Sequence, residues 1–99
     1  MIQLTKEECL AFIHNECSKG WNAWKIASFQ AQQDRLCFDF STFHKAIEVC
    51  LQRPVYTHEF INQERICDEL FKDKKSPTWE EMMSWIPDDK REKVFDQPF

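Results

Sequence analysis

Glycine occurs once in the 99 residues, at position 20, and this scarcity limits what the chain can fold into. Phosphate-binding loops, dinucleotide-binding fingerprints and nucleophile elbows each need several glycines, because close backbone approaches and sharp turns require a residue without a Cβ. The sequence therefore excludes these sites. At 12.0 kDa the chain is long enough for one domain, which we expect to span residues 1–99 with a core of modest size.

Helical signals recur along the whole chain. Thr5 with Glu8, and again Thr78 with Glu81, have the spacing of a capping box, which satisfies the free N–H groups of a helix N-terminus. Apolar residues follow at spacings of three and four, which is typical of one helix face. Helices are expected over residues 6–18, 22–35, 42–52, 58–73 and 79–85, with a further turn from Asp88 or Asp89 through Val94. The fold class is therefore predicted to be all-α, a compact single-domain bundle of five short helices, or six with the last turn, and residues 96–99 are expected to fray.

Breaker residues and apolar spacing also predict helix ends and the core. Gly20 is expected to end the first helix in a left-handed conformation, and Pro54 to stop the third. The polar stretch 30–35 is expected to continue the second helix with a solvated face. Segment 36–40 alternates like a strand but has no convincing partner, so we expect an extended linker whose aromatic side chains enter the core. The inward face of the first helix is expected to hold Cys9, Leu10, Ile13 and Cys17, with Phe12 alongside.

The charge balance and the cysteines indicate where the protein acts. Thirteen basic and seventeen acidic residues give a formal charge of −4, which argues against a dedicated phosphate-backbone binder. The first residues are acidic where a secretory signal would be apolar, and no apolar run is long enough to cross a bilayer. Five cysteines, an odd number, then favour free thiols in a reducing cytoplasm.

Cysteine and histidine spacing gives little support to a metal or thiol site. No two cysteines are close enough to form a zinc ligand pair, so most are expected to be small core side chains, and neither a metal nor a cofactor is expected. Cys37 is the best candidate for a reactive thiol, since it alternates out of phase with its apolar neighbours. His44 or His58 would then serve as its base. A cysteine-based thiol or metal protein remains one alternative.

Residues 42–73 offer a second alternative, a helix-turn-helix-like DNA-binding regulator. Its second helix would present His58, Glu59, Asn62 and Gln63 to the bases. Glu59 would repel phosphate, and the connection is centred on Pro54 where a tight glycine turn is usual. Nucleic acid is therefore not the expected partner.

The aromatic residues suggest an interaction surface. The four tryptophans are divided into core candidates, Trp24 and Trp85, and partly exposed candidates at helix starts, Trp21 and Trp79. We expect a non-enzymatic protein-binding module, of the inhibitor, immunity/antitoxin or phage-type regulatory kind, whose partner is another protein. A second copy of the chain is the other partner considered, and no membrane is expected. The partner-binding residues are predicted to be Trp21, Trp79, Asp68, Glu69, Glu80 and Glu81.

Overall fold

The computed structural model describes residues 2–95, and the tail expected to fray, residues 96–99, lies outside this part of the chain. The described residues form helices and no strand, which confirms the all-α prediction. The elements are α1 (Lys6–His14), α2 (Ala23–Ala31), α3 (Phe40–Leu51), the 3-10 helix η1 (Thr57–Ile61), α4 (Gln63–Leu70), α5 (Trp79–Ser84) and α6 (Asp88–Val94). Within residues 2–95, no helix is long and apolar enough to cross a membrane.

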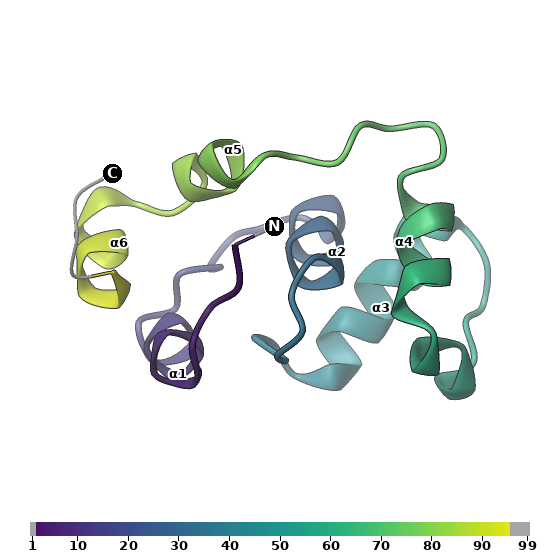
Figure 1. The fold of residues 1–99 in the computed structure, drawn as a ribbon, viewed down its shortest axis with the longest axis horizontal. Helices are drawn as coiled ribbons and strands as arrows, with labels where there is room; N and C mark the ends of the chain where they lie inside the picture. Colours follow the sequence, from purple (N-terminus) through teal and green to yellow (C-terminus); the bar gives the residue numbers. More distant parts are fainter. Residues whose placement is uncertain (1, 96–99) are drawn as a thin grey trace.

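Helix α2 lies between α1 on one side and α3 and α4 on the other (Figure 1), and it contributes side chains to two apolar clusters. The first core joins α1, α5 and α6 and comprises Leu4, Cys9, Phe12, Cys17, Phe29, Cys37, Phe38, Met82, Met83, Ile86, Val94 and Phe95. The second core joins α3 and α4 and comprises Ala27, Ala31, Phe43, Ala46, Ile47, Val55, Ile66 and Leu70. Phe29 of α2 thus enters one core, while Ala27 and Ala31 of the same helix enter the other.

Helix α1 begins as predicted and ends earlier than predicted. Thr5 and Glu8 form the expected capping box. The prediction that the helix runs to residue 18 and stops at Gly20 is wrong, because Glu16 already takes the left-handed conformation with φ of 51°. The Glu16 N–H donates to Ile13 O and the Cys17 N–H to Phe12 O, each at 3.1 Å, which is the Schellman pattern of a helix end.

The predicted inward face of α1 is partly wrong. Leu10 and Ile13 are 59% and 51% exposed, whereas Phe12 is 1% exposed. Phe12 stacks on Phe29 with ring centroids 5.2 Å apart. The helix therefore turns its Cys9–Phe12 side to the core.

Helix α2 does not continue through residues 32–35, contrary to expectation. The chain turns at Gln32, and the supposedly solvated residues Gln30 and Gln33 are 3% and 1% exposed. Each side-chain amide hydrogen-bonds a backbone group outside α2. Gln30 Oε1 accepts from Cys37 N, and Gln33 Oε1 accepts from Leu4 N. Buried amides are tolerated because they are hydrogen-bonded.

Segment 36–39 joins α2 to α3 without forming a strand, as the linker prediction requires, but it bends at Phe38 and Phe40 already belongs to α3. Phe38 is buried as expected, but so is Cys37, which was predicted to face outwards. Leu36 and Phe40, the other apolar members of the alternation, are 49% and 38% exposed. Burial therefore does not alternate along this segment, because the consecutive side chains of Cys37 and Phe38 both enter the first core.

The third and fourth predicted helices have different boundaries in the structure. Helix α3 starts at Phe40, with Asp39 as N-cap, two residues before the predicted start. The predicted helix 58–73 is two elements, because the chain breaks at Asn62, whose side chain caps α4 by accepting from Arg65 N. Helix α4 then ends at Leu70.

The C-terminal helices match the prediction closely. Thr78 and Glu81 form the second capping box, at the start of α5, and the last turn is helix α6. All four tryptophans are partly buried and pack against a core, so the division into core and partly exposed candidates is not upheld for Trp24 and Trp85. Each of these two indoles lies at the margin of a core beneath a lysine ammonium group, Lys74 Nζ at 5.0 Å and Lys25 Nζ at 5.5 Å.

Candidate functional site

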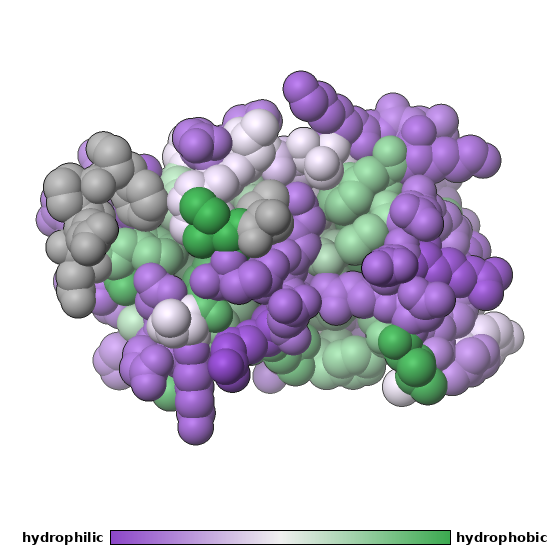
Figure 2. Space-filling model, in the orientation of Figure 1, coloured by the Kyte–Doolittle hydropathy of each residue, from purple (hydrophilic) through white to green (hydrophobic). Residues whose placement is uncertain are grey.

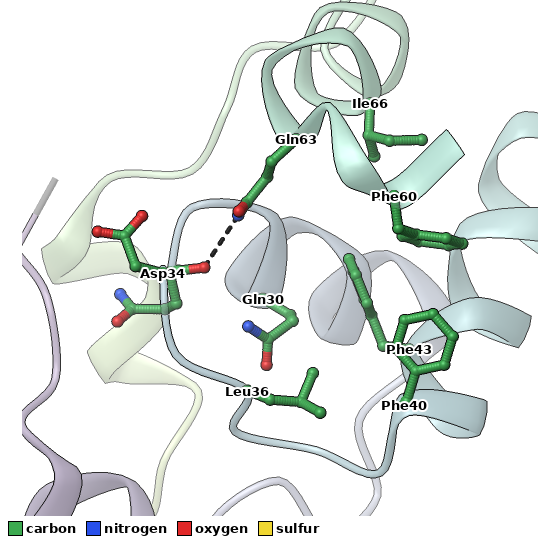
Figure 3. Close-up of a pocket in the computed structure, with 9 residues that line it drawn as sticks. Gln30, Asp34, Leu36, Phe40, Phe43, Phe60, Gln63 and Ile66 are labelled. Carbon is green, nitrogen blue, oxygen red and sulfur yellow. Dashed lines mark hydrogen bonds between the residues drawn. The ribbon is translucent and has the colours of Figure 1, made fainter. Parts of the chain in front are cut away.

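A hollow of about 150 Å³ opens between the turn after α2, the start of α3, η1 and α4 (Figure 3). We call it the aromatic pocket. It is lined by Gln30, Gln33, Asp34, Leu36, Phe40, Phe43, Phe60, Gln63 and Ile66. The rings of Phe40, Phe43 and Phe60 gather on one side, and Asp34 and Gln63 lie on the other.

Two glutamines hold the polar side of the aromatic pocket in place. Gln63 Nε2 donates to Ala31 O at 2.7 Å and to Gln33 O at 2.9 Å, so α4 is fastened to the end of α2. Gln30 Nε2 donates to Arg35 O at 2.8 Å. These hydrogen bonds fix the backbone of residues 31–35 at the rim of the pocket. The pocket therefore does not need a ligand to form.

The apolar side is built by ring packing between α3 and η1. The Phe60 ring lies edge-on to Phe40 at 5.1 Å and to Phe43 at 5.4 Å. Phe43 is buried, whereas Phe40 and Leu36 remain exposed at the rim. Exposed apolar side chains around a hollow of side-chain size are typical of a site that receives an apolar group.

A second hollow, of about 330 Å³, adjoins the aromatic pocket and shares Asp34 and Gln63 with it. We call it the acidic depression. It is lined by Ala31, Gln32, Asp34, Gln63, Glu64, Cys67 and Asp68. Between residues 2 and 95, the carboxylates of Asp34, Glu64 and Asp68 form no ion pair. Burial raises the pKa of the Cys67 thiol, and the negative charges of Asp68 and Glu64 raise it further.

The predicted partner residue Trp21 lies at the edge of the first core. Its ring is edge-on to Phe12 at 5.8 Å and to Trp85 at 5.5 Å. Its Nε1–H donates to Trp85 O at 3.3 Å. Because the indole is partly buried and hydrogen-bonded, it joins the segment before α2 to the end of α5.

Trp79, Glu80 and Glu81 lie together on α5. The Trp79 ring is partly buried, edge-on to Phe95 at 5.8 Å. Glu80 and Glu81 are exposed, and Glu81 Oε1 accepts from Thr78 N in the capping box. Their partner-binding role stays a prediction.

Asp68 and Glu69 lie on α4, apart from α5 (Figure 1). Asp68 lines the acidic depression. Glu69 accepts from Arg53 Nη2 at 2.7 Å and from Nε at 2.8 Å, a two-point pair that lowers the pKa of the Glu69 carboxyl. Hydrophilic side chains dominate the face shown in Figure 2, with hydrophobic atoms in separate patches.

The residues that a helix-turn-helix would use to contact DNA have roles within the fold. Glu59 accepts from Arg53 Nη2 at 2.9 Å, which lowers its pKa to about 2 with help from the Tyr56 N–H. Asn62 caps α4, and Gln63 is held by the turn after α2. Glu59 and Gln63 are thus engaged within the fold, whereas His58 and Asn62 remain exposed, and the DNA-binding alternative stays a prediction.

In the thiol alternative the reactive residue is Cys37, which lies in the first core. Cys37 is 1% exposed, with its Sγ 3.1 Å from Cys9 Sγ. Burial, and then the contact with Cys9, raises the Cys37 pKa far above its usual range, which disfavours the thiolate. His44 instead contacts Val55 O and lies 3.7 Å from Glu48. Nowhere between residues 2 and 95 do three or more His, Cys, Asp or Glu side chains gather as a metal site.

Leu36, Phe40 and Gln63 were not predicted to bind a protein partner, and Gln63 was considered only as a base-contacting residue of the DNA-binding alternative. Leu36 follows a polar stretch in a linker for which only the aromatic side chains were given a role, that of entering the core. The sequence did contain a signal for a helix start at Gln63, because it follows Asn62, a residue type common at helix N-caps. The convergence of these side chains depends on how α2, α3 and α4 pack, which spacing along the chain does not reveal.

The comparisons with known proteins give one match. A family model described as a domain of unknown function (DUF7736) matches residues 26–85, more than half of the chain. This stretch includes α3, α4, α5 and every residue of the aromatic pocket and the acidic depression. Neither the curated proteins nor the solved structures include a match to the chain.

Proposed function

Since this chain belongs to the DUF7736 family, whose model spans the whole aromatic pocket, we propose that it is a non-enzymatic module that binds another protein there. The pocket would receive an apolar side chain of that partner. This proposal keeps the expected function class and replaces the expected tryptophan anchor with Leu36 and Phe40.

One observation carries the proposal: an open apolar pocket whose walls are fixed while its rim remains exposed. Leu36 is 49% and Phe40 38% exposed, and Gln63 holds the opposite wall by two hydrogen bonds. Burying one leucine-sized side chain contributes about 1.5–3 kcal/mol. A pocket formed in advance avoids the entropic cost of ordering on binding, which favours its use as an anchor site.

The size and charge of the chain support the type of module we propose. An inhibitor, immunity/antitoxin or phage-type regulatory protein acts by association alone, and a formal charge of −4 would speed encounter with a basic partner. All five cysteines are free thiols, which fits action in a reducing cytoplasm. These assignments are proposals that the capture experiment below addresses.

The test compares two equally small changes at exposed leucines. The tagged protein, Leu36→Ala and Leu10→Ala are used to capture partners from an extract of the source cells, and the captured proteins are quantified by mass spectrometry. Leu10 is 59% exposed on α1, outside the family match, so its variant is the matched control. We expect a stoichiometric partner whose recovery falls at least about fivefold with Leu36→Ala, the effect of an interface residue contributing 1 kcal/mol or more.

Two results would contradict the proposal. Recovery of the partner unchanged by Leu36→Ala, with Leu10→Ala also neutral, would remove the aromatic pocket as the binding site. Recovery of nothing but the chain itself would replace the partner protein with a second copy. Circular dichroism of both variants shows that any loss is not due to unfolding.

A further inference from the structure

The aromatic pocket and the acidic depression are two halves of one open surface. They share the lining residues Asp34 and Gln63, so the two hollows adjoin at these side chains. The aromatic pocket, at about 150 Å³, has room for one side chain, and the adjoining depression is about 330 Å³. Two neighbouring side chains of a peptide segment could therefore occupy both.

The charges on this surface are of one sign. Asp34, Glu64 and Asp68 line the acidic depression, and neither hollow is lined by a lysine or an arginine. Glu64 and Asp68 stand four residues apart on α4 and therefore lie on the same side of the helix, a spacing at which like charges are unfavourable. Within residues 2–95 these three carboxylates have no ion-pair partner to offset that repulsion.

We infer that the partner presents an apolar side chain next to a lysine or arginine, the apolar group entering the aromatic pocket and the cation the acidic depression. The inference rests on the proposed function of the aromatic pocket and adds the chemistry of the occupant. Charge complementarity selects this occupant, because an anion beside the apolar group would meet three carboxylates.

The experiment uses two dipeptide probes that differ only in charge. N-acetyl-Phe-Arg amide and N-acetyl-Phe-Gln amide are titrated into the 15N-labelled full chain, and affinities are taken from amide chemical shifts. Both probes should shift the amides of Leu36 and Gln63. We expect the arginine probe to bind about three- to fivefold more tightly, as for a solvent-accessible ion pair, and to shift Asp68 as well.

Two triple variants separate local from overall charge. Asp34→Asn/Glu64→Gln/Asp68→Asn should bring the two affinities together and leave the glutamine probe's affinity unchanged. The control Glu7→Gln/Asp89→Asn/Glu92→Gln removes the same charge at exposed positions elsewhere and should keep the preference for arginine. A preference that survives the first variant would overturn the inference, because the local carboxylates would then not be its source.

The remaining outcomes distinguish this inference from the proposed function. Equal binding of both probes to the wild-type chain, with shifts at Leu36 and Gln63, overturns the cationic occupant and supports the pocket. Shifts absent from Leu36 and Gln63 with either probe overturn both, because no apolar side chain then enters the aromatic pocket.

Discussion

Gln33 ties the N-terminal segment to the end of α2 from inside the protein. Its Oε1 accepts from Leu4 N and its Nε2 donates to Ile2 O, both at 2.9 Å, while the side chain is 1% exposed. A polar stretch such as 30–35 indicates solvent exposure on average, since buried amides are rare. Only the long-range partner, 29 residues away, makes burial favourable here, and no local pattern contains that information.

Replacing this amide tests the assignment. Gln33→Ala leaves the Leu4 N–H buried without an acceptor, so we expect a loss of about 1–3 kcal/mol in the free energy of unfolding. Urea denaturation followed by circular dichroism measures it. A loss below about 0.5 kcal/mol, the usual range for surface substitutions, would show that Gln33 is not a buried tie.

Two residues with positive φ give a paired prediction. Glu16 stands at φ 51° and Gly20 at φ 83°. A side chain in this region costs about 1–2 kcal/mol, so Glu16→Gly should stabilise the protein by about 0.5–1 kcal/mol after the entropy of glycine is included. Gly20→Ala should destabilise it by about 1 kcal/mol, although its Cβ would meet nothing within 4 Å. Thermal unfolding of both variants checks the opposite signs, and two shifts of the same sign would contradict the backbone assignment.

At the scale of elements, helix starts were more predictable than helix ends. Thr5 and Thr78 cap where expected because a capping box is encoded within four residues. The ends differ because tertiary contacts decide them: α1 stops at a left-handed glutamate, and the predicted helix 58–73 breaks at Asn62 so that Gln63 can reach the end of α2. The pocket follows from these breaks, which is why the sequence did not predict it.

Arg53 joins three elements through two carboxylates. It follows α3 and bonds Glu59 of η1 and Glu69 of α4. Both carboxyl pKa values are lowered by these hydrogen bonds, that of Glu59 from 4.5 to about 2. A lowered pKa in the folded state stabilises it above the unfolded value, and this contribution is lost as the pH falls from about 4.5 towards 2.

We therefore expect Arg53→Ala to flatten the acid limb of the stability profile. The wild type should lose more stability than the variant between pH 5 and pH 2, and the two slopes should agree between pH 6 and pH 8. Urea midpoints across this range provide the measurement. Parallel profiles throughout would contradict the assignment of these carboxylates to Arg53.

At the scale of the whole molecule, α2 divides the chain into two cores along the longest dimension of 37 Å. The match to residues 26–85 contains all of the second core and only part of the first, since α1 and α6 lie outside it. The proposed binding surface lies beside the second core, within the matched stretch. The all-α class could be predicted from periodicity and caps, whereas the division into two cores depends on opposite faces of α2.

Thiol accessibility reports on both cores at once. Cys9, Cys17 and Cys37 are buried in the first core, while Cys50 and Cys67 are only partly buried at the second. In the native protein we expect at most two thiols, Cys50 and Cys67, to react rapidly with an uncharged maleimide, and all five in denaturant. Rapid labelling of Cys9 or Cys37, located by peptide mass spectrometry, would contradict the first core.

Photo-cross-linking at the pocket rim tests the central claim most directly. p-Benzoyl-phenylalanine replaces Leu36 in one version of the protein and Leu10 in another, and each is irradiated in the source cells. The account predicts a discrete adduct with another protein from position 36 and none from position 10. Equal adducts from both positions, or an adduct from position 10 alone, would show that the aromatic pocket is not where this protein meets its partner.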